Sequence, residues 1–219
     1  MNVSHEHRVI WLTKPEMGEK FVATALEPFN FETIDVKNNG RPTTKQHISF
    51  IDKIPSGCED YSLILSMRNP YFQIINYYLK VSETNWVLKS QSREEFKESL
   101  NKWVSEIFSV DEEVLLQTDN NLQQIFPYKF HGKHIDFVIK YEKIQESLID
   151  LLFLMGKNLR TNQNLLKDTT EFEIDALTFE NAQKIYKVFK KTFNDFNYDP
   201  FSFSSGEFSL KEKVDFIHN

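Results

Sequence analysis

The stretch Leu63-Ile-Leu-Ser-Met-Arg-Asn-Pro-Tyr71 predicts an α/β fold. Its apolar run, rich in Leu and Ile, indicates a buried strand, Asn69-Pro70 indicates a turn, and the apolar residues from Phe72 to Lys80 indicate a helix. The strand therefore delivers Arg68 to its carboxyl end. In an open α/β sheet, ligands bind in the crevice beyond this end of the strands, so Arg68 is a candidate anion-binding residue. The alternative interpretation is a surface arginine that ends a strand.

A second segment of the same kind lies nearer the N-terminus. Arg8 to Thr13 predicts a short strand, residues 14–20 predict a loop with one glycine and two lysines, and Phe21 to Leu26 predicts the start of a helix. Free N–H groups at the start of a helix, with a lysine nearby, make an anion site. The loop is not a Walker A sequence, because it lacks the first glycine and Phe21 follows Lys20 where Ser or Thr would stand.

Together the two segments resemble the sulfotransferases that use 3'-phosphoadenosine-5'-phosphosulfate (PAPS), in the branch of carbohydrate sulfotransferases and their bacterial and viral relatives. In that family a loop of the type P-K/R-T-G-G/S-T/R holds the 5'-phosphosulfate. A later strand ends in R-N/D-P-Y/F/W-x-R-x-x-S-x-Y, whose Arg and Ser hold the 3'-phosphate. The first pattern is matched by Pro15, Met17 and Gly18, with Lys20 at its end, and the second by Arg68, Asn69, Pro70, Tyr71 and Tyr78.

The resemblance extends along most of the chain, from about Arg8 to Pro200. Residues 134–144 are similar to the family's D-F-x-x-R-Y-E-x-L strand, and residues 178–200, ending in Tyr198-Asp-Pro, to its C-terminal helix and F-x-x-F-x-Y-x-P block. The chain departs from both family motifs. In the loop, Glu16 replaces the Lys or Arg, and Glu19, Lys20 and Phe21 replace the Ser or Thr positions that follow the glycine. In the 3'-phosphate motif, Gln73 replaces the second Arg and Asn76 replaces the Ser.

The resemblance implies a three-layer, P-loop-like α/β fold with a short central parallel sheet flanked by helices, formed by one sulfotransferase-like domain over residues 1–219. It implies transfer of a sulfuryl group from PAPS to a hydroxyl of a small molecule or glycan. The residues it assigns to PAPS are Lys14, Pro15, Met17, Gly18, Glu19, Lys20, Phe21, Arg68 and Asn76.

Sulfuryl transfer requires cations on the charged oxygens and a base near the acceptor hydroxyl. Lys14 and Lys20 are the local cations, and His47 is the candidate base because the family often has a histidine in the interval before the 3'-phosphate strand. The other interpretation of His47 is a structural or solvated histidine. His131 and His134 indicate a polar turn before the next strand rather than a zinc site, because no cysteine accompanies them. The sequence contains no zinc or calcium pattern, so we expect no metal.

Composition sets further limits. The 219 residues are 40% hydrophobic and allow one substantial core, and the net charge of −6 disfavours a general nucleic-acid partner. Cys58 is the one cysteine, so no internal disulfide is possible. No signal peptide precedes the first predicted strand and no run approaches a membrane span, so we expect a cytoplasmic protein of bacterial or viral (phage) origin, without a membrane partner.

Two alternatives to the enzyme stay open. One is a non-catalytic, sulfotransferase-like binding or assembly protein whose nucleotide loop is degraded by Glu16 and Glu19. The other is a nucleotide-dependent phosphotransferase, which the missing Walker Lys-Ser/Thr pair disfavours. The acceptor and the oligomeric state are not indicated by the sequence.

The remaining segments predict scaffold. Apolar spacing predicts helices over residues 92–107, opened by a capping box from Ser92 to Glu95, over 111–125, over 144–155, ended by Gly156, and over 177–196. Residues 202–206 predict a flexible tail element. Tyr71, Tyr77 and Tyr78 are predicted to pack against the sheet, with stacking of one of them on an adenine as the alternative.

Overall fold

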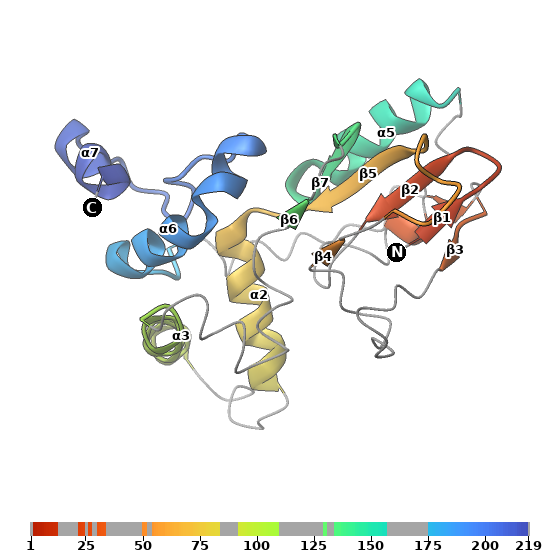
Figure 1. Cartoon of the computed structure of the whole chain (residues 1–219). Helices are drawn as coiled ribbons and strands as arrows, with labels where there is room; N and C mark the ends of the chain where they lie inside the picture. The colour runs from red at the N-terminus through yellow and green to blue at the C-terminus, as the bar shows by residue number, and fades with distance from the viewer. Residues whose placement is uncertain are drawn as a thin grey trace. The chain divides into compact units, whose positions relative to one another are not determined.

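The chain divides by its internal contacts into two compact units, which interleave along the sequence. The first comprises Met1–Arg68 and Tyr128–Lys167, and the second Asn69–Pro127 and Asp168–Asn219 (Figure 1). The structure is a computed structural model that describes residues 2–12, 22–24, 26–27, 30–33, 50–51, 54–83, 92–109, 129–130, 134–156 and 175–218. One sulfotransferase-like domain over 1–219 stays a prediction.

The first unit is built on a five-stranded sheet in the order β3-β1-β2-β5-β7. Its strands are β1 (Asn2–Ser4), β2 (Val9–Leu12), β3 (Glu32–Thr33), β5 (Ser62–Met67) and β7 (Phe137–Lys140). Strands β2, β5 and β7 are parallel, whereas β1 is antiparallel to both β2 and β3. A separate parallel pair joins β4 (Phe50–Ile51) to β6 (Lys129–Phe130).

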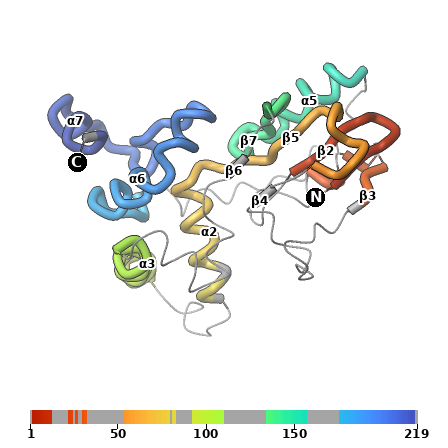
Figure 2. The backbone as a smooth tube through the Cα atoms, in the orientation of Figure 1, coloured from red at the N-terminus to blue at the C-terminus, as the bar shows by residue number. Residues whose placement is uncertain are grey.

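The α/β class is therefore confirmed, but the sheet is mixed rather than parallel throughout. The N-terminal residues, which precede the first predicted strand, form β1 and turn back into β2 as a hairpin (Figure 2). Val3 and Ser4 are both fully buried in it. Three residues are too few to show a strand period in the sequence, which is why the pattern did not predict β1.

Register explains how the sheet buries its apolar residues. Trp11 pairs with Ile64, and Ile64 pairs with Phe137, so these side chains share one face. Helix α5 (Ile144–Leu154) packs on this face through Ile144, Leu148, Leu151 and Leu152. The opposite face is buried too, as Ile10, Leu12 and Leu65 show. Burial on both faces accounts for the continuous apolar runs that predicted these strands.

Two sets of polar groups in or beside this sheet are hydrogen-bonded to each other. The Trp11 indole N–H donates to Ser66 Oγ at 2.8 Å. At the amino end of β5, the Asp136 carboxylate accepts the Leu63 N–H at 2.7 Å, and the Asp136 N–H donates to the Leu63 carbonyl at 2.9 Å. Helix α5 ends as predicted before Gly156, which adopts a left-handed φ of 66°.

The described part of the second unit is helical. It contains α2 (Pro70–Glu83), α3 (Arg93–Ile107), α6 (Phe179–Asp195) and α7 (Leu210–His218). The predicted capping box is confirmed, because Glu95 N–H donates to Ser92 Oγ and Ser92 N–H donates to a Glu95 carboxylate oxygen. The predicted helix over 111–125 lies outside the described residues.

The tail prediction for residues 202–206 is wrong. Phe203 is buried in the aromatic core, the hydroxyls of Ser204 and Ser205 donate to the Asp175 carboxylate at 2.8 and 2.6 Å, and the Ser205 N–H also donates to it. These hydrogen bonds, from Ser205 first and Ser204 second, lower the pKa of Asp175. Small polar residues usually indicate a loop, and only the tertiary structure supplies the carboxylate that holds this one.

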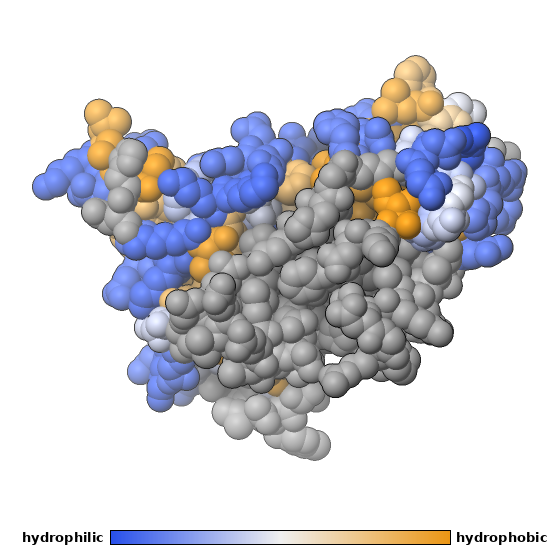
Figure 3. Space-filling model, in the orientation of Figure 1, coloured by the Kyte–Doolittle hydropathy of each residue, from blue (hydrophilic) through white to orange (hydrophobic). Residues whose placement is uncertain are grey.

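Exposed apolar residues lie on α2, at Val81, and on α5 and α7. On α5 these are Ile149, Phe153 and Leu154, and on α7 they are Leu210 and Val214. Figure 3 shows the corresponding hydrophobic groups at the surface over α5 and α7. Residues that are already exposed gain little from folding, so they provide controls for substitutions in the core.

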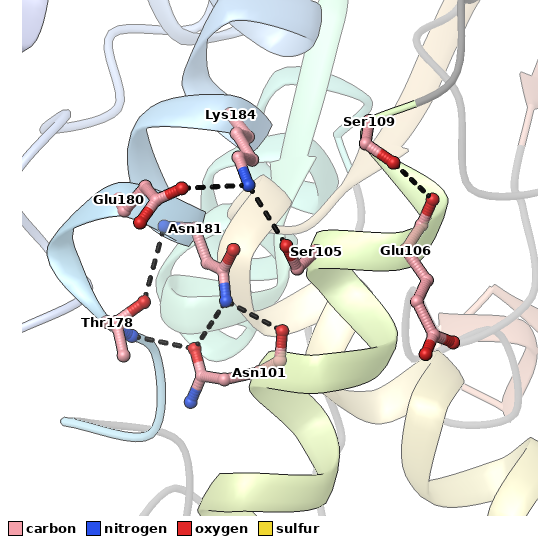
Figure 4. A network of polar contacts seen from close by, with 8 residues as sticks. All are labelled: Asn101, Ser105, Glu106, Ser109, Thr178, Glu180, Asn181 and Lys184. Carbon is pink, nitrogen blue, oxygen red and sulfur yellow. Dashed lines mark hydrogen bonds and ion pairs between the residues drawn. The ribbon is translucent and has the colours of Figure 1, made fainter.

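A polar network fixes α3 against α6 in the second unit (Figure 4). The Asn101 side-chain oxygen accepts the Thr178 N–H at 2.8 Å and the Asn181 amide at 3.0 Å. Its amide nitrogen donates to the carbonyls of Lys97 and Ala176, both at 2.8 Å. One side chain therefore satisfies groups on both helices and on the segment that precedes α6.

We expect Asn101→Leu to lower the free energy of unfolding by roughly 2–3 kcal/mol, because several partly buried partners lose their hydrogen bonds together. Denaturant unfolding followed by circular dichroism measures the change. Ser105→Ala is the matched control on the same helix, since the Ser105 hydroxyl contacts only Lys184 Nζ at 3.1 Å in this network. Equal stability of the Asn101 variant and the control would contradict the role of the network.

Candidate functional site

Arg68 lies at the carboxyl end of the parallel strands of the first unit. Met67 is the last residue of β5 and pairs with Lys140, the last residue of β7. Arg68 directly follows β5, and Tyr141 directly follows β7. Tyr141 is the first residue of the short 3-10 helix η4 (Tyr141–Lys143). The parallel register therefore brings these two side chains together, and this is the edge at which open α/β sheets bind ligands.

The Arg68 side chain is buried rather than solvated. The residue is 3% exposed, and its Cζ lies 4.3 Å from the centroid of the Tyr141 ring. A guanidinium over an aromatic face is attracted by the ring quadrupole, more strongly when water is excluded. The alternative interpretation of Arg68 as a surface residue that ends a strand is therefore wrong.

Asn76 belongs to helix α2 of the second unit. Its side-chain amide donates to the Phe72 carbonyl, one turn earlier, at 2.9 Å. One N–H of the Asn76 side-chain amide is thus used in a hydrogen bond within α2. Gln73, which stands where the resembled family has a second arginine, is buried on the same helix. Whether Asn76 holds a phosphate stays a prediction.

Asn69 and Tyr71, the neighbours of Arg68 in the R-N-P-Y motif, have structural contacts. The Asn69 side-chain oxygen accepts the Tyr71 N–H at 3.0 Å at the start of α2, and its amide donates to Ser202 Oγ at 2.7 Å. The Tyr71 hydroxyl donates to the Pro200 carbonyl at 2.7 Å. The motif therefore joins α2 to the Tyr198-Asp-Pro block, a contact between distant segments that sequence reasoning missed.

The three tyrosines of this region are core residues. Tyr71 is fully buried, and Tyr77 and Tyr78 are each 8% exposed. The Tyr78 ring lies 5.8 Å from Phe96 and 5.3 Å from Trp103, centroid to centroid. Burial is thus confirmed for them, but they belong to the aromatic cluster of the helical unit, so packing against the sheet is not what the structure shows.

The other predicted site residues lie outside the described part of the chain. They are the loop residues Lys14, Pro15, Met17, Gly18, Glu19, Lys20 and Phe21, and the candidate base His47. Their roles stay predictions.

The described residues contain no group of three or more His, Cys, Asp or Glu side chains that could hold a metal ion. Among the helices of that same part of the chain, none is long and apolar enough to cross a membrane.

Comparison with known proteins gives no match: no family model fits the chain, and neither a curated protein nor a solved structure is significantly similar to it. The likeness to sulfotransferases therefore rests on the motifs quoted above. Among the described residues, Arg68 is a cation of those motifs, and it follows β5 at the carboxyl edge of the sheet.

Proposed function

We propose that the protein is a PAPS-dependent sulfotransferase whose nucleotide site lies at the carboxyl edge of the β2–β5–β7 sheet. One observation carries this proposal: Arg68, the first residue of the R-N-P-Y motif, follows β5 at this edge with its guanidinium buried against Tyr141. A desolvated guanidinium forms strong, charge-assisted bonds to phosphate oxygens. Arg68 would bind the 3'-phosphate of the nucleotide.

The proposed chemistry uses residues that the resemblance assigns to the site. Lys14 and Lys20 would neutralise the 5'-phosphosulfate, and Gly18 would allow the backbone to approach it. The acceptor hydroxyl oxygen forms a bond to sulfur while the bond between sulfur and the bridging oxygen breaks, and that electron pair leaves with 3'-phosphoadenosine-5'-phosphate. His47 would take the hydroxyl proton. The acceptor is a small molecule or a glycan.

The product nucleotide, 3'-phosphoadenosine-5'-phosphate, tests the proposal in calorimetric titrations, with ATP and AMP as controls. We expect binding that depends on the 3'-phosphate. Arg68→Ala should weaken it by about 1.5–3 kcal/mol, the usual scale for a hydrogen bond to a charged group.

Arg93→Ala is the matched control, because Arg93 is an exposed arginine at the start of α3. It should bind the nucleotide as the wild type does. Wild-type protein that binds the product nucleotide and AMP equally would overturn the nucleotide assignment, and normal binding by Arg68→Ala would overturn the role of Arg68.

A non-catalytic binding or assembly protein is the second candidate. It is favoured by Glu16 and Glu19 in the loop, whose carboxylates would repel a phosphosulfate, and by the Asn76 amide, which donates within its own helix. The two candidates differ in one result: binding of the product nucleotide without sulfuryl transfer from PAPS to any acceptor supports the second.

A further inference from the structure

The aromatic ring beside Arg68 suggests a further role at this site. The Arg68 Cζ lies 4.3 Å from the Tyr141 ring centroid, and Arg68 is 3% exposed. The five N–H groups of a guanidinium lie in its plane. A contact between the cation and a ring face therefore holds the group without consuming those donors.

The position of Tyr141 is itself fixed by the local structure. The residue follows β7 directly, so the ladder with β5 sets its place beside Arg68. The Tyr141 carbonyl accepts the Ile144 N–H at the start of α5, and Ile144 is buried against the sheet. The Lys140 N–H donates to Ser147 Oγ of α5 at 3.3 Å. The strand ladder and the start of α5 thus fix the backbone on both sides of Tyr141.

The same sheet contains a comparable pair at its other end. Arg8 Cζ lies 5.7 Å from the Tyr61 ring centroid, before β2 and β5 begin, and Arg8 is ion-paired with Asp60. There the arginine is exposed, because 60% of its side-chain surface is accessible. This pair has the same chemistry but lies at the amino ends of the strands, which makes it an internal control.

We propose that Tyr141 is a positioning residue that orients the Arg68 guanidinium for the 3'-phosphate, so that it determines selectivity for 3'-phosphorylated nucleotides. This inference rests on the proposed function. A flexible arginine must give up conformational freedom to bind a phosphate, and a side chain that is already held on a ring has less to lose. Tyr141 acts through Arg68 and does not touch the ligand.

The test measures a selectivity ratio, the Kd for AMP divided by the Kd for 3'-phosphoadenosine-5'-phosphate. We expect Tyr141→Phe to keep the wild-type ratio, because the ring remains. Tyr141→Leu should lower the ratio about 3- to 30-fold, the range of a desolvated cation–π contact. Tyr141→Met, which keeps bulk without an aromatic face, is the second variant in case the leucine variant does not fold. Tyr61→Leu should leave the ratio unchanged.

A double-mutant cycle separates positioning from a general structural effect. In the Arg68→Ala background, Tyr141→Leu should cause no further loss of selectivity, because its target is absent. A purely structural Tyr141 would instead change thermal stability while the ratio stays at the wild-type value.

The two proposals fail in distinguishable ways. Wild-type protein without selectivity for the 3'-phosphate overturns the proposed function and this inference with it. Selective wild-type protein that loses selectivity in Arg68→Ala but keeps it in both Tyr141→Leu and Tyr141→Met overturns the inference alone. Loss of selectivity in Tyr141→Phe would also overturn it, because the hydroxyl rather than the ring would then matter.

Discussion

Tyr71→Ala is expected to lower the free energy of unfolding by about 3–5 kcal/mol, the range for truncating a buried aromatic side chain. Tyr71 is fully buried. Its ring centroid lies 4.9 Å from that of Phe193 and 5.5 Å from that of Phe203, and its hydroxyl donates to the Pro200 carbonyl. Chemical denaturation of the purified variant measures the loss.

Tyr71→Phe is the matched control, because it removes only the hydroxyl. Its expected cost is about 1–2 kcal/mol, since the partly buried Pro200 carbonyl loses its donor. If the alanine and phenylalanine variants were equally stable, the packing of the Tyr71 ring would not contribute to stability.

Tyr71→Phe should also change how stability depends on pH in the alkaline range. Burial first, and then the nearby Tyr186 and Asp199, raise the pKa of the Tyr71 hydroxyl above its ordinary value. Above the ordinary tyrosine pKa the folded state therefore keeps a proton that the unfolded state releases. The contribution of the Tyr71 hydroxyl to the free energy of unfolding is thus fully present below that pKa and is lost as the pH rises above it. Tyr71→Phe should remove this part of the alkaline loss of stability.

Phe216→Ala is expected to lower the free energy of unfolding by about 3–4 kcal/mol, because it leaves a cavity in an aromatic cluster. Phe216 is fully buried on α7. Its ring centroid lies 5.2 Å from those of both Phe179 and Phe201, and 5.7 Å from that of Phe203. Denaturant unfolding again provides the measurement, with near-ultraviolet circular dichroism to report the aromatic packing.

Leu210→Ala controls for changes to α7 as a helix. Leu210 is 80% exposed, so its removal should change the stability by less than about 0.5 kcal/mol. If Phe216→Ala were as mild as this control, α7 would not belong to the core of the second unit.

The Tyr71 prediction also separates two roles within one motif. Asn69 and Tyr71 have contacts inside the second unit, whereas Arg68 is the last residue of the first segment of the first unit and lies over Tyr141. We therefore expect Tyr71 variants to change stability, and Arg68 and Tyr141 variants to change nucleotide binding. Either result alone leaves the other open to test.

The local pattern of apolar residues was sufficient to predict the strands and helices in which that pattern has a clear period. The apolar runs of β2 and β5 predicted those strands, and helical spacing predicted α3, α5 and α6, with the Ser92 capping box and Gly156 marking their ends. The physical reason is that burial on two faces demands a continuous apolar run in a strand, and burial on one face demands a period of 3.6 in a helix. The very short strands β1 and β3 carry no such period, and they were missed.

Less of the candidate site than of the fold could be predicted from the sequence. The sequence by itself determined that an arginine ends an apolar strand before a turn, which made Arg68 a candidate. Only the tertiary structure decided that Arg68 is buried over Tyr141, that Tyr71 donates to Pro200, and that Asp175 holds the 202–206 segment. These contacts join residues far apart in the chain, and their energy comes from the exclusion of water and the satisfaction of buried polar groups, which exist only after the strands and helices have packed.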